Sequence, residues 1–244
     1  MSRSRRVEFA CGFVLHQRPY RDTSLIVELY TRDHGRLTGF ARAARGPRTR
    51  FLGLQPFRPL LLSWSGRGEA PTLTAAEGDG PPPAPLAQSC LLSAFYLNEL
   101  LLKLTVQHDP QPGLYALYAT TVERLRAGVS VEPVLRQFEK QLLDQLGYGT
   151  ELARDAGDGS AVQPDAYYHF QPGEGVYRVD EVAPEAMPGR VLLQLAAGEV
   201  PADAPGQQQA RLLLRASLDH CLEGRELATR TVARAVARME RASR

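Results

Sequence analysis

The chain has 244 residues, enough for one large domain or two small ones, and its 43% apolar and 23% charged residues are ordinary for a globular protein. The net charge of +2 excludes a uniformly basic nucleic-acid coat, yet residues 1–80 carry 13 Arg, no Lys and 7 acidic residues, which leaves +6 there and −4 in the remainder. The three cysteines are widely spaced, which predicts neither a disulfide framework nor a zinc knuckle. No long apolar segment is present, so we expect no signal sequence, no membrane partner and a cytoplasmic protein.

The first third of the chain is predicted to form five short strands. Gly35, in the turn at 33–36, is available for a positive φ and indicates a hairpin, and Pro59 places a strand near an edge or at its start. The strand-like segments are 9–16, 23–31, 37–43, 57–64 and 70–76. This number of short strands predicts a small barrel of the oligonucleotide-binding (OB) type, with an SH3-like barrel or an open meander as alternatives.

An arginine-rich loop follows the third predicted strand, with a turn predicted at Gly46-Pro47 and no acidic residue between positions 36 and 50. Its arginines are Arg42, Arg45, Arg48 and Arg50, with Arg36 just upstream. Guanidinium groups present a planar fork of donors that matches phosphate oxygens, so the loop predicts a polyanion contact. The alternative is a solvated loop, because arginine outnumbers lysine 27 to 2 throughout the chain.

A small barrel that binds single-stranded nucleic acid combines a positive groove with aromatic rings on which bases stack. Tyr20 and Phe51 flank turns and are predicted to be exposed for stacking, whereas Trp64 and Phe40 lie within apolar segments and favour a place in the core. The predicted DNA-backbone contacts are Arg18, Arg21, Arg36, Arg42, Arg45, Arg48 and Arg50. Nothing in the pattern predicts recognition of base sequence.

The proline-rich segment 81–85 predicts a stiff linker, because prolines interrupt both strands and helices. We therefore expect an OB domain at 1–80 and a helical domain at 86–244, with an irregular insert near 150–205. Predicted helices span 86–106, 113–127, about 133–146, 191–197, 207–222 and 226–239, and predicted short strands span 167–170 and 175–179. The expected fold class is α+β, an N-terminal five-stranded OB barrel followed by a mainly helical domain.

Signals for catalysis are weak along the whole sequence. The five histidines lack metal-binding spacing, and neither a phosphate-binding glycine loop nor a nucleophile elbow is present. We therefore expect no catalytic residues, no metal and no cofactor, and a nuclease or deaminase is disfavoured.

Arg136 and Lys140 lie four residues apart on a predicted helix, on a face different from its apolar stripe. Like charges at that spacing repel slightly, so the pair favours docking of an acidic peptide whose apolar end needs a neighbouring groove. A solvated face neutralised by the nearby Glu139 and Asp144 is the alternative.

Several short motifs occur along most of the chain. They are Phe13-Val-Leu-His-Gln-Arg-Pro-Tyr-Arg-Asp-Thr-Ser24, His34-Gly35-Arg36, Ala41-Arg-Ala-Ala-Arg-Gly46, Leu54-Gln-Pro-Phe57, Tyr96-Leu-Asn-Glu-Leu100, Arg136-Gln-Phe-Glu139 and Leu146-Gly-Tyr-Gly149. In these motifs and their order the chain resembles the RecO family of bacterial recombination mediators. Each motif is short, but their combination is specific, and the match weakens between about 150 and 205.

The resemblance implies an OB barrel followed by a helical domain, and a function in DNA repair without catalysis. It implies binding to single- and double-stranded DNA, annealing of complementary strands, and cooperation with RecR in loading the RecA recombinase. It also implies binding of the acidic, apolar C-terminal tail of single-stranded DNA-binding protein, which gives Arg136 and Lys140 a ligand, and a cytoplasmic protein associated with the nucleoid during repair.

Some family members carry a four-cysteine zinc motif after the Leu-Gly-Tyr-Gly segment. Residues 150–159 of this chain contain no cysteine, so the resemblance does not extend to zinc. Two other classes of function stay open from the residues alone: an RNA-binding OB module, and a protein adaptor whose barrel docks partners.

Overall fold

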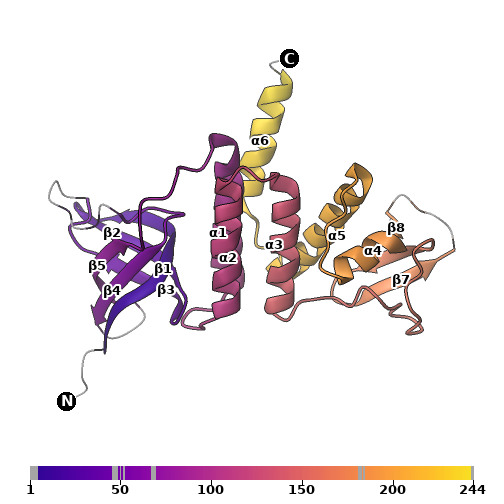
Figure 1. Ribbon diagram of the computed structural model, residues 1–244, viewed down its shortest axis with the longest axis horizontal. Coiled ribbons are helices and arrows are strands. Elements are labelled where there is room, and N and C mark those ends of the chain that lie inside the picture. The colour runs from indigo at the N-terminus through magenta and orange to yellow at the C-terminus, as the bar shows by residue number, and fades with distance from the viewer. Residues whose placement is uncertain are drawn as a thin grey trace. The chain divides into compact units, whose positions relative to one another are not determined.

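A computed structural model describes residues 5–45, 49, 51, 53–66, 70–180, 183 and 185–242. Most of its elements are labelled in Figure 1. The chain forms two compact units, one made of Met1–Ala127 with Leu227–Arg244 and the other of Gly128–Glu226.

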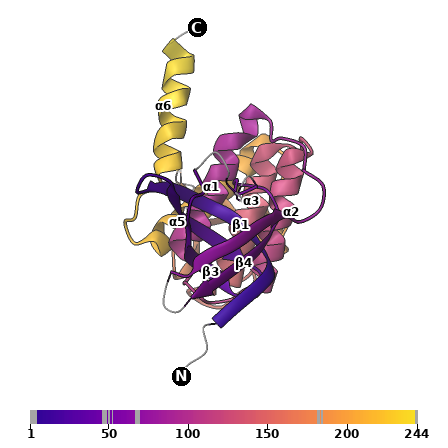
Figure 2. The same cartoon turned by 90° about the vertical axis from the view of Figure 1, so that its left-hand side faces the viewer.

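The first unit contains a five-stranded barrel, which faces the viewer in Figure 2. Its strands are β1 (Arg5–Tyr20), β2 (Ser24–Thr31), β3 (Gly35–Ala41), β4 (Leu60–Gly66) and β5 (Thr72–Gly78). The strands join in the order β1-β2-β3-β5-β4, β1 pairs with β4, and a single parallel pair, Phe40 with Thr72, joins β3 to β5. The five predicted strands and the OB-type arrangement are confirmed, and Pro59 lies directly before β4 as expected.

The barrel interior is filled by alternate residues of the strands, because successive side chains of a strand point to opposite faces. Val27 and Leu29 of β2, Leu37 of β3 and Leu62 of β4 are almost fully buried in one apolar cluster. Trp64 belongs to the same cluster, with 6% of its surface exposed, so its predicted place in the core is confirmed.

Two helices cover the outer face of β1 and β2. They are α1 (Gln88–Leu104) and α2 (Pro112–Arg126). The Phe13 ring packs edge-on against Tyr118 of α2, with ring centroids 5.1 Å apart. Asn98 of α1 donates to the Leu15 carbonyl at 2.8 Å and accepts from the Tyr118 hydroxyl at 2.6 Å, so one buried amide joins β1, α1 and α2.

The β2–β3 hairpin contacts the segment that follows α1. Gly35 has φ +66°, and a Cβ at this position would lie 2.3 Å from the Asp109 carbonyl oxygen, so both the turn and the close approach require glycine. The predicted positive φ is confirmed. The next residue, Arg36, accepts a backbone hydrogen bond from His108 at 2.8 Å.

The second unit is a small α+β structure. Its elements are α3 (Val131–Gln145), β6 (Tyr167–Gln171), β7 (Gly175–Val179), β8 (Met187–Pro188), α4 (Gly189–Ala196) and α5 (Ala204–Leu222). The strands lie in the order β7-β6-β8, and α3 packs against α5. Asp155 accepts hydrogen bonds from the Gly157 and Arg178 N–H groups at 2.7 and 2.6 Å, which joins the irregular segment before β6 to β7.

The proline-rich segment 81–85 lies between β5 and α1 without regular structure, as predicted. The described helices begin and end within a few residues of the predicted ones, the last being α6 (Ala228–Ala242). The compact units, however, place α1, α2 and α6 with the barrel, whereas the sequence assigned them to the helical domain. The division at 1–80 and 86–244 stays a prediction.

Candidate nucleic-acid interface

Four exposed arginines lie at one end of the barrel, where β1 turns into β2 and β3 ends. We call Arg18, Arg21, Arg42 and Arg45, together with Tyr20, the basic edge. The strand register aligns Arg18 of β1 with Ile26 of β2 and Ile26 with Phe40 of β3, so the ends of β1 and β3 lie on either side of β2. The Arg45 N–H donates to the Thr23 carbonyl at 2.8 Å, which fixes the two loops side by side.

The backbone of both loops adopts the left-handed conformation at a residue with a side chain. Arg21 has φ +52° and Ala43 has φ +55°. Such positions are uncommon outside glycine, cost on the order of 1 kcal/mol or more, and gather at binding sites. Asp22 is the acidic residue nearest in sequence, so the edge carries an excess of positive charge.

Tyr20 supplies an aromatic ring beside these charges. Its surface is 37% exposed, and its ring centroid lies 5.5 Å from that of Phe40. The guanidinium carbon of Arg21 lies 5.2 Å from the centroid of the Tyr20 ring. Phe40 itself is half-buried. A partly exposed ring held by an aromatic neighbour and a cation offers a surface on which a base can stack.

Phe51 requires a correction, because the prediction of an exposed stacking ring is wrong. Its side chain is 5% exposed and packs in the barrel cluster with Leu54 and Leu60. The chain re-enters the barrel here, and the Phe51 N–H donates to the Thr49 hydroxyl at 3.1 Å. The predicted contacts Arg48 and Arg50, and the predicted turn at Gly46-Pro47, lie outside the described residues.

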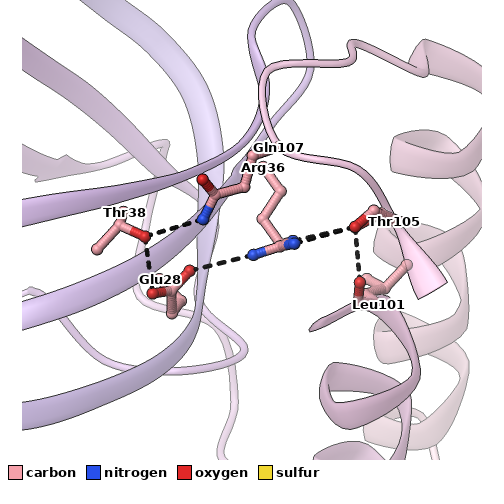
Figure 3. Close-up of polar contacts among 6 residues, drawn as sticks. All are labelled: Glu28, Arg36, Thr38, Leu101, Thr105 and Gln107. Carbon is pink, nitrogen blue, oxygen red and sulfur yellow. Dashed lines mark hydrogen bonds and ion pairs between the residues drawn. The ribbon is translucent and has the colours of Figure 1, made fainter. Parts of the chain in front are cut away.

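Arg36 lies in a different environment from the basic edge. Figure 3 shows its guanidinium between the barrel and the end of α1. It donates to the Thr105 carbonyl at 3.0 Å and the Thr105 hydroxyl at 3.3 Å, and it pairs with Glu28 at 3.4 Å, with 14% of its side chain exposed. Glu28 also accepts from Thr38, which in turn accepts from Gln107. These partners occupy the guanidinium, so we leave Arg36 out of the proposed interface.

Replacing Arg36 with alanine is expected to lower the free energy of unfolding by about 2 kcal/mol, since hydrogen bonds to a partly buried charged group are worth roughly 1.5–3 kcal/mol. DNA affinity should stay unchanged. Urea denaturation and an oligonucleotide titration measure the two quantities. The control is Arg32→Ala on the same hairpin, whose ion pair with Asp33 is half-exposed and should contribute nothing measurable. Lost DNA affinity with normal stability would place Arg36 in the interface instead.

The predicted docking pair on α3 is already neutralised within the protein. Arg136 pairs with Glu139 at 2.9 Å, with 8% and 2% of the two side chains exposed. Lys140 pairs with Asp144 at 2.6 Å, with 13% of the lysine side chain exposed. The expectation of an open basic face is therefore wrong for Arg136, whose charge is buried, while Lys140 keeps a small exposed area.

Phe9 is an exposed aromatic residue that the sequence pattern does not predict to be at the surface. The register of β1 against β4 shifts between Val7 and Ala10, and Phe9 takes φ +54° in this bulge. Its N–H donates to the Ser63 hydroxyl at 3.1 Å, and 60% of its surface is exposed. Alternation along the strand could not reveal the bulge, because none of residues 7–10, where the register shifts, is a glycine that would signal one.

The described part of the chain contains no cluster of three or more His, Cys, Asp or Glu residues that could hold a metal ion. Within the same ranges, none of the helices has the length and apolar character needed to span a membrane.

Comparison with known proteins covers almost the whole chain. The family model "Recombination protein O N terminal" matches residues 9–80, and "Recombination protein O C terminal" matches residues 90–231. Among similar proteins is the "DNA repair protein RecO" of Azoarcus sp. (strain BH72), 44% identical over 95% of this chain and 97% of the relative. The protein of the same name from Alkalilimnicola ehrlichii is 46% identical over 98% and 95%, and that from Laribacter hongkongensis is 43% identical over 97% and 98%.

Proposed function

Because the chain belongs to the recombination protein O (RecO) family of bacterial DNA repair proteins, we propose that it acts as a non-catalytic recombination mediator. Membership of this family supports a role in DNA repair and recombination. The proposal adds that the protein binds single- and double-stranded DNA and anneals complementary strands. It further adds that the protein, with RecR, helps load RecA onto DNA coated by single-stranded DNA-binding protein.

The observation that supports DNA binding is the basic edge with its exposed tyrosine. Arginine side chains bind the phosphates of DNA whatever its base sequence, and each contact releases counterions from the DNA. Tyr20 adds a stacking surface that tolerates every base. In this proposal the edge lowers the repulsion between two phosphate backbones, and base pairing between the strands supplies the specificity.

The partner side of the proposal is docking of the acidic tail of single-stranded DNA-binding protein. Lys140 remains the candidate contact on α3, although a tail carboxylate would have to compete with Asp144 for it. The proposal assigns Arg136 a structural role, since its charge is buried against Glu139.

A strand-annealing assay on DNA coated with single-stranded DNA-binding protein tests the proposal. We expect the protein to accelerate annealing of complementary strands under the intact coat, and to do so much less when the coat protein lacks its acidic tail. On naked complementary strands, where no docking is needed, the protein should also accelerate annealing. Absence of acceleration on naked DNA would contradict the proposed DNA activity, and a stronger response with matched RNA would favour an RNA-binding module.

A further inference from the structure

Helix α6 carries a second row of arginines that lies outside the basic edge. Arg230, Arg234 and Arg238 recur every four residues, which places them on one face of the helix with a rise of about 6 Å between neighbours. Arg234 and Arg238 are exposed, and the Arg230 guanidinium carbon lies 5.8 Å from the centre of the Tyr96 ring on α1. The four-residue spacing of these arginines is visible in the sequence, within the helix predicted at 226–239.

The start of α6 is fixed to α1 by one carboxylate. Glu99 accepts hydrogen bonds from the Ala228 and Thr229 N–H groups at 2.8 and 2.9 Å and from the Thr229 hydroxyl at 2.6 Å. Partial burial alone would raise the pKa of Glu99, but these hydrogen bonds outweigh it and lower the pKa. A carboxylate at a helix N-terminus satisfies its unpaired N–H groups and interacts favourably with the helix dipole.

The rest of α6 keeps its helical form while its side chains remain largely open to solvent. Residues 231–239 are all exposed, and Figures 1 and 2 show the helix extending away from α1 and the barrel of the same unit. Alanine and arginine, both strong helix formers, make up most of its sequence. The arginine row is thus presented on a preformed support, although like charges four residues apart disfavour the helix slightly.

We propose that the face formed by Arg230, Arg234 and Arg238 binds the phosphate backbone of a second nucleic-acid strand. This inference rests on the proposed function and extends it, because annealing requires two strands to be held by one protein. The basic edge holds one strand, and α6, in the same compact unit, holds the other. Val232 and Val236 lie on the side of α6 opposite the arginines and have no part in the contact.

The test is the number of short single-stranded oligonucleotides bound per chain, measured by fluorescence titration at low salt. The wild-type chain should bind two and R234Q/R238Q one, and the variant should anneal complementary strands at least about tenfold more slowly. Circular dichroism checks that the helix persists. The matched control is R211Q/R215Q on α5, which removes the same charge at the same spacing from arginines that face Glu132 and Asp219. V232Q/V236Q should also keep two sites.

Several results would overturn the inference. The first is two sites in R234Q/R238Q, and the second is an equal loss in the α5 control. The third is binding to anionic phospholipid vesicles that depends on Arg234 and Arg238 while the wild-type chain takes up only one oligonucleotide. A wild-type chain that binds one strand, lost in R42Q/R45Q, would refute the α6 site and leave the proposed function standing. A wild-type chain that binds none would refute both.

Discussion

Replacing Arg136 with alanine is expected to destabilise the protein by about 3–5 kcal/mol, because it breaks a buried ion pair by removing one of its two members. The two side chains are 8% and 2% exposed, so solvent screens their interaction little. Urea denaturation followed by circular dichroism measures the loss.

A double substitution separates the cost of breaking the buried ion pair from the loss of packing at this face of α3. Arg136→Met combined with Glu139→Leu removes both charges and keeps apolar volume, so it should recover most of the stability lost in Arg136→Ala. Binding of an acidic, apolar peptide should be unaffected by this double variant. If Arg136→Ala instead keeps normal stability and loses affinity for the peptide, the arginine is a docking residue as the sequence suggested.

Charge reversal of Arg42 and Arg45 together is expected to weaken binding to single-stranded DNA by at least about 25-fold at 0.1 M salt. This figure assumes that each arginine releases about 0.7 counterion on contact with a phosphate, and reversal adds repulsion to the lost contacts. Equilibrium titration with a labelled oligonucleotide measures the effect. Both side chains are exposed, so stability should not change appreciably.

The charge-matched control for this variant is R211E/R215E, which makes the same change on α5, in the other compact unit. It should weaken DNA binding far less, because a general change in net charge acts weakly at physiological salt. Equal losses in the two variants would show that net charge, and not the basic edge, governs the affinity.

The barrel could be predicted from the sequence because its strands follow local rules. Alternating apolar residues mark β2 and β3, and Gly35 between them marks the hairpin. The arginines of the basic edge were found for the same reason: strands bury alternate side chains, while the loops between them remain exposed.

The errors concern residues whose environment is set by segments far away in the chain. Arg36 was grouped with the loop arginines, but its partner Thr105 lies 69 positions further along. Phe51 was expected at the surface because it flanks a turn, yet the chain folds back into the barrel there. For Arg136, spacing along the helix predicted which face it occupies but not that this face is buried with Glu139. Local patterns predict elements and loops, whereas burial of single polar groups depends on tertiary contacts.

The salt dependence of single-stranded DNA binding shows whether the basic edge contacts the DNA backbone. Affinity is measured from low to moderate salt for the wild-type chain and for R42Q/R45Q, and the logarithm of the binding constant is plotted against the logarithm of the salt concentration. If both arginines contact phosphates, the slope of the variant should be smaller in magnitude by about 1.4, since each contact with a single strand contributes about 0.7. An unchanged slope would contradict the assignment of the basic edge as the DNA-backbone contact.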